Sequence, residues 1–374
     1  MIAEMIQRAR VAQAQFEKFN QKEVDAIVRA IGKVVFDNAE ELARDAVDET
    51  RMGVFEDKIA KNKGKSLAIW NNLKDKNSVG IIGKDEEKKL VYVAKPVGVV
   101  GAVTPTTNPV VTPMCNAMFA LKGRNAIIVA PHPRAKLISN KTVRLMNEEI
   151  AKLNGPENLI QCIEEPSIPL TSELMKAVDV LVATGGPGMV SAAYSSGKPS
   201  YGVGAGNVQV VVDRGYDYEQ AAQHIIAGRK FDNGIICSGE QSVIAPRDEY
   251  SQVIAAFEKH GAFYVEDQET VDKFRAILFE DGHIAKDVVG QSVQAIAKLA
   301  GVEVPDKTQV ILLRSNDQES DVLRKEKMCP VMVALQYDSF EQATALAKSN
   351  LLLEGAGHTS AVHSNNQEHI EYIG

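Results

Sequence analysis

Hydrophobic positions recur at helical spacing from the start of the chain to about residue 75. One such stripe predicts an amphipathic helix and consists of Ile27, Ile31, Val34 and Val35. A polar stretch at 84–89 follows these helices, and residues 90–94 then alternate between apolar and polar positions. We therefore predict a helical N-terminal region followed by an exposed strand, which lies in an arm that spans 88–95.

From residue 97 the pattern changes, and short β-rich apolar runs alternate with helical stretches. The predicted strands are 97–103, 126–130, 178–184 and 208–213, and the predicted helices between them include 136–152 and 186–195. This alternation predicts an α/β fold with a mostly parallel sheet and helices on both faces. Sheets of this kind bind ligands beyond the carboxyl ends of their strands.

The pattern begins again after residue 213. Helices are predicted at 217–229 and 248–260, and strands at 242–245, 308–313, 331–337 and 359–363. A length of 374 residues at ~100–200 residues per domain agrees with more than one domain. We expect one domain from 1–87 and 96–213, the arm at 88–95, and a second domain at 214–374. The chain ends at HIEYIG, where the pattern predicts no closing helix.

The composition is that of an ordinary globular protein, with 45% hydrophobic and 24% charged residues. The formal net charge is −7 and no basic block occurs, so we expect neither a nucleic-acid nor a membrane partner. Charges interrupt the N-terminal segment, which excludes a signal-peptide core. Four cysteines without a C-x-x-C pair fit a reducing cytoplasm. The seven histidines form no zinc motif, so we expect no metal.

Cys237 lies in the segment DNGIICSGEQ, between a predicted helix and a predicted strand, with Gly234 and Gly239 on either side. A loop cysteine of this kind can be presented to a cleft, where a lowered pKa makes it a nucleophile. The alternative is a buried, inert thiol. That is our interpretation of the other three, Cys115, Cys162 and Cys329.

Two further segments follow predicted strands. Asn108, in TPTTNP, can offer its side-chain amide to a developing oxyanion, although an Asn before Pro also forms ordinary turns. In ATGGPG (183–188), the glycines allow backbone N–H groups to approach a phosphate at a helix N-terminus, and a plain turn is the alternative. The segment GVGAGN (202–207) imitates a dinucleotide fingerprint, but a strand follows it. We therefore interpret this segment as a tight turn.

Taken in order, VGVVGAVTPTTNP, AIIVAPHP, ATGGPG, GVGAGN, NGIICSGE and EKMCPV resemble the aldehyde dehydrogenase superfamily over essentially the whole chain. The resemblance implies a Rossmann-type cofactor domain, an α/β catalytic domain and an oligomerisation arm. It also implies Cys237 as nucleophile, Asn108 as the oxyanion-hole amide and Glu326 as a ligand of the nicotinamide ribose. The other cofactor contacts that it implies are Thr104, Pro105, Thr106, His132, Arg134, Thr184, Gly185, Gly186 and Gly188. Ser238 and His358 are its implied substrate contacts.

One departure from the family pattern bears on the reaction. Gly202 stands where hydrolytic members carry a Glu that activates water, and no carboxylate occurs from 196 to 212. A thiol acceptor needs no such base, because its reference pKa of ~8.5 makes thiolate available. The sequence therefore resembles the CoA-acylating branch, with coenzyme A as co-substrate.

Within this branch, DETRMGVFEDKIAKN and YSSGKPSYGVGAGNVQ look most like the CoA-acylating succinate-semialdehyde dehydrogenases. We expect reversible, NAD(P)H-dependent reduction of succinyl-CoA to succinic semialdehyde through a Cys237 thioester. The alternatives are acetaldehyde or another short-chain substrate, a glutamyl-phosphate-reductase-like enzyme, a hydrolytic aldehyde dehydrogenase, and a scaffold that has lost the chemistry.

Two further departures concern the cofactor and the end of the chain. Where many members carry Lys-Pro-x-Glu, Pro133 replaces the Glu that would repel a 2′-phosphate and Arg134 offers a cation. We therefore expect NADP as the cofactor. The alternative is NAD, in which case Arg134 simply faces solvent. The family also has a further C-terminal segment with an oligomer-forming strand, and this sequence stops before it. We expect a cytoplasmic homo-oligomer, a dimer or a tetramer, with the arm pairing through its edge strand.

Overall fold

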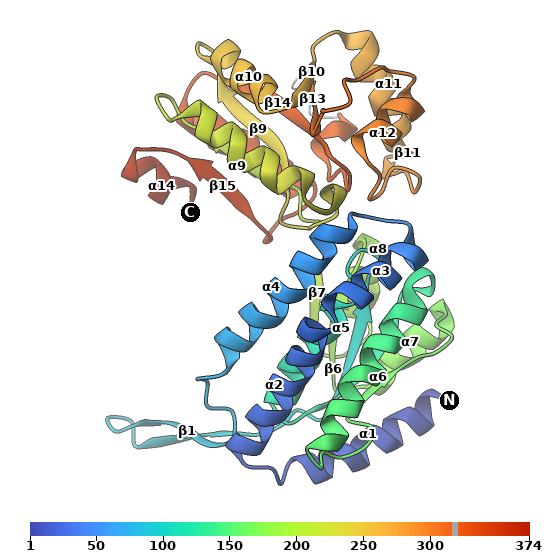
Figure 1. Ribbon diagram of the computed structural model, residues 1–374. Helices are drawn as coiled ribbons and strands as arrows, with labels where there is room; N and C mark the ends of the chain where they lie inside the picture. Colours follow the sequence, from blue (N-terminus) through green and yellow to red (C-terminus); the bar gives the residue numbers. More distant parts are fainter. Residues whose placement is uncertain (316–320) are drawn as a thin grey trace. The chain divides into compact units, whose positions relative to one another are not determined.

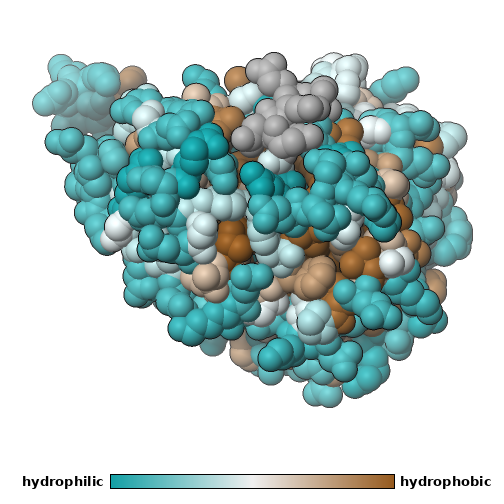
Figure 2. Space-filling view, turned by 90° about the horizontal axis from the view of Figure 1, so that it is seen from above, coloured by the Kyte–Doolittle hydropathy of each residue, from teal (hydrophilic) through white to brown (hydrophobic). Residues whose placement is uncertain are grey.

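The computed structural model describes residues 1–315 and 321–374, which form two compact units (Figure 1). Unit 1 comprises Met1–Arg51 and Phe55–Gly204, and unit 2 comprises Met52–Val54 and Ala205–Gly374. The face of the molecule in Figure 2 is mostly hydrophilic, with hydrophobic residues showing between the polar side chains. Among the described residues, no helix has the length and apolar character needed to cross a membrane.

Unit 1 begins with the predicted helical region. Its helices are α1 (Ile2–Phe16), α2 (Gln21–Asp37), α3 (Ala39–Thr50), α4 (Phe55–Leu73), α5 (Val111–Lys122), α6 (Lys136–Lys152), α7 (Ile168–Ala177) and α8 (Pro187–Tyr194). The predicted stripe of α2 is buried, and a capping box between Asn20 and Glu23 fixes the start of this helix. The predicted N-terminal helices are therefore confirmed.

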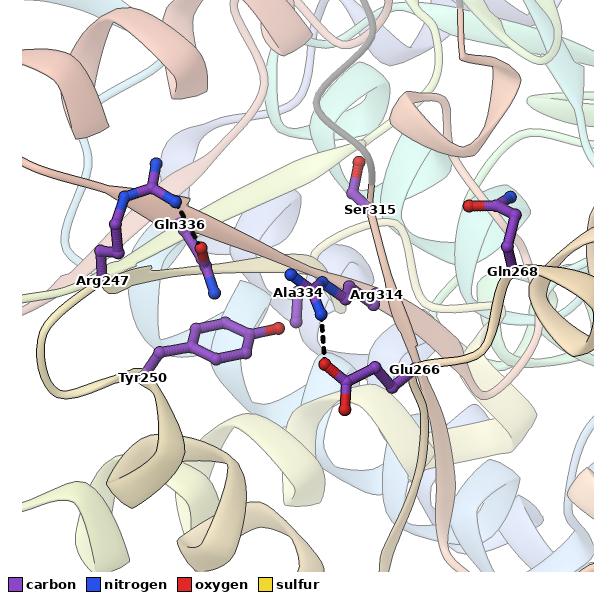
Figure 3. A pocket seen from close by; sticks show the side chains of 8 residues that line it. All are labelled: Arg247, Tyr250, Glu266, Gln268, Arg314, Ser315, Ala334 and Gln336. Atoms are coloured by element: carbon purple, nitrogen blue, oxygen red, sulfur yellow. Dashed lines mark hydrogen bonds and ion pairs between the residues drawn. The ribbon is translucent and has the colours of Figure 1, made fainter.

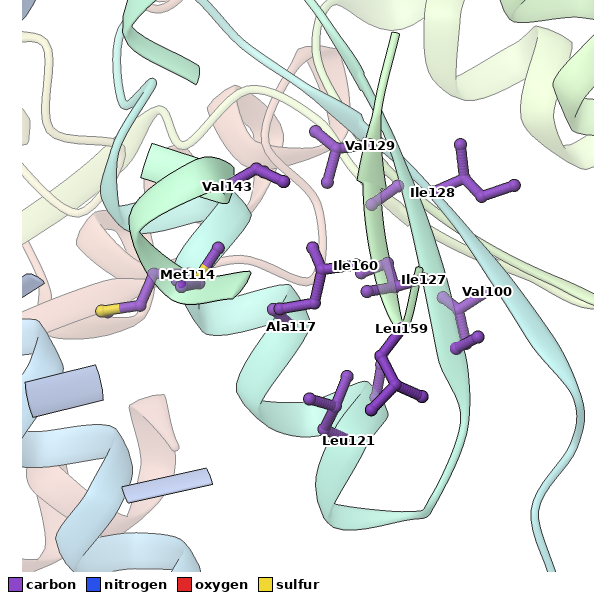
Figure 4. Packing of buried hydrophobic residues seen from close by; sticks show 14 of the residues in the cluster. Val100, Met114, Ala117, Leu121, Ile127, Ile128, Val129, Val143, Leu159 and Ile160 are labelled. Atoms are coloured by element: carbon purple, nitrogen blue, oxygen red, sulfur yellow. The ribbon is translucent and has the colours of Figure 1, made fainter. Parts of the chain in front are cut away.

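The sheet of unit 1 has five parallel strands in the order β5-β4-β3-β6-β7. They are β3 (Val99–Thr104), β4 (Ala126–Pro131), β5 (Ile160–Cys162), β6 (Val180–Thr184) and β7 (Ser200–Val203). Every residue of β3 and β4 is buried, which explains their continuous apolar runs. Ala117 and Leu121 of α5 belong to the same core cluster as Ile127 and Ile160 of the sheet (Figure 4).

A two-stranded antiparallel hairpin of β1 (Gly80–Asp85) and β2 (Leu90–Ala94) extends from unit 1 (Figure 1). The arm predicted at 88–95 is therefore only the second half of this element, which begins at Gly80. The first strand, GIIGKD, contains two glycines and only two adjacent isoleucines, so its sequence shows no alternating strand pattern. The large apolar side chains that the hairpin exposes are Ile81, Ile82, Leu90, Val91, Tyr92 and Val93.

The sheet of unit 2 has six parallel strands in the order β10-β13-β14-β9-β8-β15. They are β8 (Val208–Val212), β9 (Glu240–Pro246), β10 (Ala262–Val265), β13 (Val310–Arg314), β14 (Val331–Tyr337) and β15 (Ser360–His363). A separate two-stranded sheet joins β11 (Phe279–Glu280) and β12 (His283–Ile284). We predicted a domain boundary after residue 213, but β8 belongs to this second sheet and the units divide after Gly204.

Helices cover both faces of the second sheet. They are α9 (Tyr218–Lys230), α10 (Tyr250–Lys259), α11 (Gln268–Leu278), α12 (Val293–Ala300), α13 (Phe340–Leu353) and α14 (Gln367–Ile373). Successive strand residues such as Val210 and Val211 belong to two different core clusters. One cluster includes α9 and α10, and the other includes α11, α12 and α13. Because successive strand residues point to opposite faces, the two clusters lie on opposite sides of the sheet.

The helix α14 corrects the prediction that the chain ends without one. His369 Nδ1 lies within hydrogen-bond distance of Asp213 Oδ2 (2.6 Å), and its ring stacks on Phe340 at 3.9 Å between centroids. A helix this short is marginal on its own. These tertiary contacts, together with the Asn366 cap, hold it in place.

Candidate active site

In unit 1, the predicted cofactor residues gather at one edge of the sheet. Thr104 ends β3, Pro131 ends β4 and Thr184 ends β6, and β3 lies between the other two strands. Pro105, Thr106 and Asn108 follow β3 directly, and His132 and Arg134 follow β4. The structure thus brings these residues to the carboxyl edge of a parallel sheet, as the sequence predicted.

The segment after β6 opens α8, as predicted. Gly186 is its N-cap, and no side chain caps the first-turn amides. Added β-carbons at Gly186 and Gly188 would meet nothing within 4 Å. On the neighbouring strand, the Thr104 hydroxyl is buried without a hydrogen-bond partner among the described residues. An open helix N-terminus beside an unpaired hydroxyl fits the pyrophosphate and polar groups of a nicotinamide dinucleotide.

His132 has a local structural contact. Its Nδ1 accepts a hydrogen bond from the backbone N–H of Arg134 (3.1 Å), which caps the short 3-10 helix Pro133–Ala135. Burial and, secondarily, the Arg134 charge lower the pKa of His132. Arg134 itself is exposed at the end of β4.

Asn108 is half-buried and held at both ends of its amide. Its Oδ1 accepts a hydrogen bond from Lys61 Nζ of α4 (2.9 Å), and its Nδ2 donates to Thr107 Oγ1 (3.2 Å). Lys61, which is only 7% exposed, was not predicted as a site residue from the sequence. A single lysine on a helix gives no sign of burial, since most lysines are exposed.

In unit 2, Cys237 lies in the loop between the 3-10 helix Phe231–Gly234 and β9. Its side chain is exposed, whereas Cys329 is fully buried and Cys115 and Cys162 are partly buried. Burial raises the pKa of Cys115 and Cys329 to about 11 and that of Cys162 to about 12. These three thiols are therefore poor sources of thiolate at neutral pH.

The GVGAGN segment runs from β7 to β8 and passes directly beside Cys237. A β-carbon at Gly206 would lie 1.7 Å from the Cys237 carbonyl oxygen, so only glycine fits there. The Gly206 N–H donates to Glu326 Oε1 (3.0 Å). The sequence had assigned these three residues to separate motifs, and the structure brings them together in unit 2.

Asn207, the last residue of the GVGAGN segment, holds the segment in place through its side-chain hydrogen bonds. It is fully buried, and its Nδ2 lies within hydrogen-bond distance of the carbonyl oxygens of Arg324, Asn350 and Glu354. Glu354 Oε2 in turn accepts from the Glu326 backbone N–H (2.7 Å). Burial raises the pKa of Glu326.

All of these unit 2 residues precede strands. Gly206 comes before β8, Cys237 before β9, Glu326 before β14 and His358 before β15. They therefore lie at the amino edge of the sheet, and for Cys237 this agrees with its predicted place between a helix and the following strand. His358 Nδ1 contacts Thr359 Oγ1 at 2.8 Å, and burial lowers the pKa of His358. Ser238 is exposed beside Cys237.

A separate pocket of about 300 Å³ opens at the carboxyl edge of the same sheet (Figure 3). Its charged side chains are paired: Arg314 bonds to Glu266, and Arg247 Nη1 donates to Gln336 Oε1 (2.6 Å). It lies at the opposite ends of the strands from Cys237, and the predicted site residues do not line it. Across the described ranges, no three His, Cys, Asp or Glu side chains are grouped to hold a metal.

Comparison with known proteins identifies the family of this chain. Residues 1–374 match the Aldehyde dehydrogenase family. The succinate-semialdehyde dehydrogenase (acetylating) of Clostridium kluyveri is 62% identical over 374 residues, which cover 100% of this chain and 83% of the relative. An acetylating aldehyde dehydrogenase from Geobacillus thermoglucosidasius has a TM-score of 0.96 at 36% identity, covering 100% of this chain and 83% of that one.

A propionaldehyde dehydrogenase from Rhodopseudomonas palustris, solved with bound CoA and an acylated cysteine, has a TM-score of 0.89 at 30% identity. The match covers 100% of this chain and 85% of that chain. The chain therefore belongs to the aldehyde dehydrogenase family. The predicted α/β fold, the oxidoreductase class and the resemblance to the CoA-acylating succinate-semialdehyde dehydrogenases are confirmed.

Proposed function

We propose that this protein catalyses the reversible reduction of succinyl-CoA to succinic semialdehyde and free CoA, with NAD(P)H as reductant. The observation that carries the proposal is the placement of Cys237. It is an exposed thiol whose backbone packs against Gly206, and the Gly206 N–H donates to the carboxylate of Glu326. The 62% identity to the Clostridium kluyveri enzyme supports the succinyl chain.

In the reductive direction, the Cys237 thiolate attacks the thioester carbonyl carbon of the acyl-CoA. The Asn108 amide and the Cys237 backbone N–H donate to the oxyanion, which then collapses and expels CoA as its thiolate. Hydride supplied by NAD(P)H reduces the acyl-enzyme to a thiohemiacetal. Its collapse releases the aldehyde and regenerates the Cys237 thiolate, and one proton is consumed overall to give free CoA thiol.

The surroundings of Gly202 support transfer to a thiol over hydrolysis. A β-carbon there would lie 2.6 Å from Val190 Cγ1 and 2.8 Å from Tyr194 Cε2, because α8 packs against β7 at this point. The position therefore has no room for a carboxylate side chain without displacement of α8 residues. Water then lacks a general base at this position, whereas a thiol acceptor is already nucleophilic.

We propose NADP as the preferred cofactor, with NAD as the alternative. The first turn of α8 and the Thr104 hydroxyl would hold the pyrophosphate region, and Glu326 would bind the nicotinamide ribose. Arg134, exposed at the end of β4, would pair with the 2′-phosphate. Ser238 and His358 are proposed as substrate contacts.

We further propose that the protein is a cytoplasmic homo-oligomer. The hairpin β1–β2 exposes six large apolar side chains on a sheet of only two strands, and such an element is marginal by itself. Pairing with another copy of this chain would cover it. None of the four cysteines forms a disulfide in the described residues, which agrees with a reducing compartment.

The test follows oxidation of NADPH and NADH with succinyl-CoA, beside acetyl-CoA, together with release of free CoA. The proposal predicts oxidation with succinyl-CoA that requires Cys237. Oxidation with acetyl-CoA but not with succinyl-CoA would support a CoA-acylating reaction and would show that the succinyl assignment is wrong. Aldehyde oxidation that proceeds without CoA would contradict the proposed reaction.

A further inference from the structure

Lys61 is a buried cation beside the amide that the proposed reaction uses. It lies on α4, is 7% exposed, and places Nζ 2.9 Å from Asn108 Oδ1. Burial of an ammonium group costs free energy unless the charge is paired or hydrogen-bonded. The hydrogen bond to Asn108 is one of the interactions of Lys61 that offset this cost.

The chemistry of the two groups fixes the orientation of the amide. An ammonium group only donates hydrogen bonds, so the side of Asn108 that faces Lys61 has to be its oxygen. Nδ2 is thereby directed away from Lys61. One of its hydrogens is donated to Thr107 Oγ1 (3.2 Å). The other hydrogen meets no acceptor among the described residues.

The surroundings of this pair are crowded. Lys58, Asn62 and Thr107 line the same small pocket as Lys61 and Asn108, with a volume of about 10 Å³. That is space for about one water molecule, so the pocket holds no substrate. Lys58 and Lys61 lie close to one turn apart on α4, and both are buried.

We propose that Lys61 is a positioning residue that acts through Asn108. Its charged hydrogen bond holds Oδ1, presents the free Nδ2 hydrogen to the acyl oxygen, and polarises the amide so that this hydrogen is a stronger donor. The inference rests on the proposed function, in which Asn108 stabilises the oxyanion. Preorganised donors of this kind act mainly on turnover, because charge develops on the oxygen only in the transition state.

The experiment is a double-mutant cycle with Lys61→Met, Asn108→Ala and the combined variant. The readout is NADPH oxidation with succinyl-CoA, as kcat and KM. Loss of one oxyanion donor costs roughly 10²–10³ in kcat. We expect Lys61→Met to lower kcat by roughly 10- to 100-fold, with the KM for NADPH changed less than about threefold. In the Asn108→Ala background, Lys61→Met should have less than about a twofold further effect.

Lys61→Arg and Lys61→Gln separate positioning from folding. Arg keeps the charged donor and should restore part of the kcat, while Gln keeps a neutral donor and should restore less. They also serve as test variants if Lys61→Met does not fold. Lys63→Met, which removes an exposed lysine from the same helix, should behave as wild type.

Two results would overturn the inference. If the losses of Lys61→Met and Asn108→Ala multiply in the double variant, Lys61 does not act through Asn108. If Lys61→Met raises KM and leaves kcat unchanged, Lys61 binds substrate or cofactor instead. An Asn108→Ala variant with wild-type kcat would overturn the oxyanion assignment itself, and absence of NADPH oxidation in the wild type would overturn the proposed function.

Discussion

Gly206 lies so close to Cys237 that a β-carbon at residue 206 would sit 1.7 Å from the Cys237 carbonyl oxygen. The same glycine donates its N–H to Glu326. One residue without a side chain thus sets the distance between the proposed nucleophile and the proposed ribose ligand. The proposed placement of Cys237 depends on this contact, and adding a single methyl group at residue 206 tests it.

Gly206→Ala should displace the Cys237 loop, because the new methyl group overlaps a backbone oxygen that cannot rotate away. We expect kcat to fall by roughly 100-fold, because the reacting groups are misplaced, and stability to fall by ~1–3 kcal/mol. Gly204→Ala is the matched control, since its β-carbon would meet nothing within 4 Å. Steady-state kinetics and thermal unfolding of both variants check the prediction, and equal behaviour of the two would contradict it.

Gly202→Glu should not create a hydrolytic enzyme. The carboxylate would be a general base in the right chain position, but Val190 and Tyr194 occupy the space that it needs. We expect lower stability and no aldehyde oxidation in the absence of CoA. The measurement is NADPH formation from succinic semialdehyde with and without CoA. CoA-independent turnover in this variant would show that sterics at residue 202 do not limit the reaction.

Arg134→Ala should weaken the binding of NADPH much more than the binding of NADH. A charge-assisted hydrogen bond to the 2′-phosphate contributes ~1.5–3 kcal/mol, which corresponds to a rise in the KM for NADPH of roughly tenfold or more. The KM for NADH should change by less than about twofold. Arg144→Ala removes an exposed arginine of α6 as a control. An equal change with both cofactors would mean that Arg134 does not read the 2′-phosphate.

Lys327 should make stability depend on pH. It is fully buried, and its Nζ donates to the carbonyl oxygens of Leu323 (2.7 Å) and Lys325 (2.6 Å). Burial, and secondarily the charge of Arg229, lower its pKa from 10.5 to about 7. Above that pH the unfolded chain binds a proton that the folded chain does not, so the free energy of unfolding rises with pH.

The expected contribution of Lys327 is at most ~1.4 kcal/mol per pH unit between about pH 7 and pH 10. Lys327→Met should remove this contribution, whereas Lys286→Met, which changes an exposed lysine of the same unit, should retain it. Urea unfolding followed by circular dichroism across this range checks the difference. The same slope in wild type and Lys327→Met would refute the assignment.

The sequence predicted individual helices and strands better than it predicted how they combine into sheets and units. Helix 136–152 matches α6 because its hydrophobic period and length are local properties. In contrast, β8 was assigned to the wrong unit, because the apolar sequence of a strand does not indicate which sheet the strand joins. The strand β7 was missed because its four residues, SYGV, are short and partly exposed.

The same contrast between local and tertiary properties applies to the candidate site. Cys237, Asn108 and Glu326 were predicted as site residues from the resemblance and from local motifs. That Gly206 touches Cys237 could not be read from their separation in the chain, since a loop-to-loop contact is a tertiary property. Lys61 gave no signal at all, because burial of a lysine depends on what packs around its helix.

The central claim is that Cys237 carries the acyl group. Incubation of the protein with succinyl-CoA in the absence of NAD(P)H, followed by intact-mass and peptide mass spectrometry, tests it directly. The account predicts one succinyl group per chain, located on Cys237, stoichiometric release of CoA, and loss of the adduct when NADPH is added. A succinyl group on another residue, or an unmodified chain that still oxidises NADPH with succinyl-CoA, would contradict it.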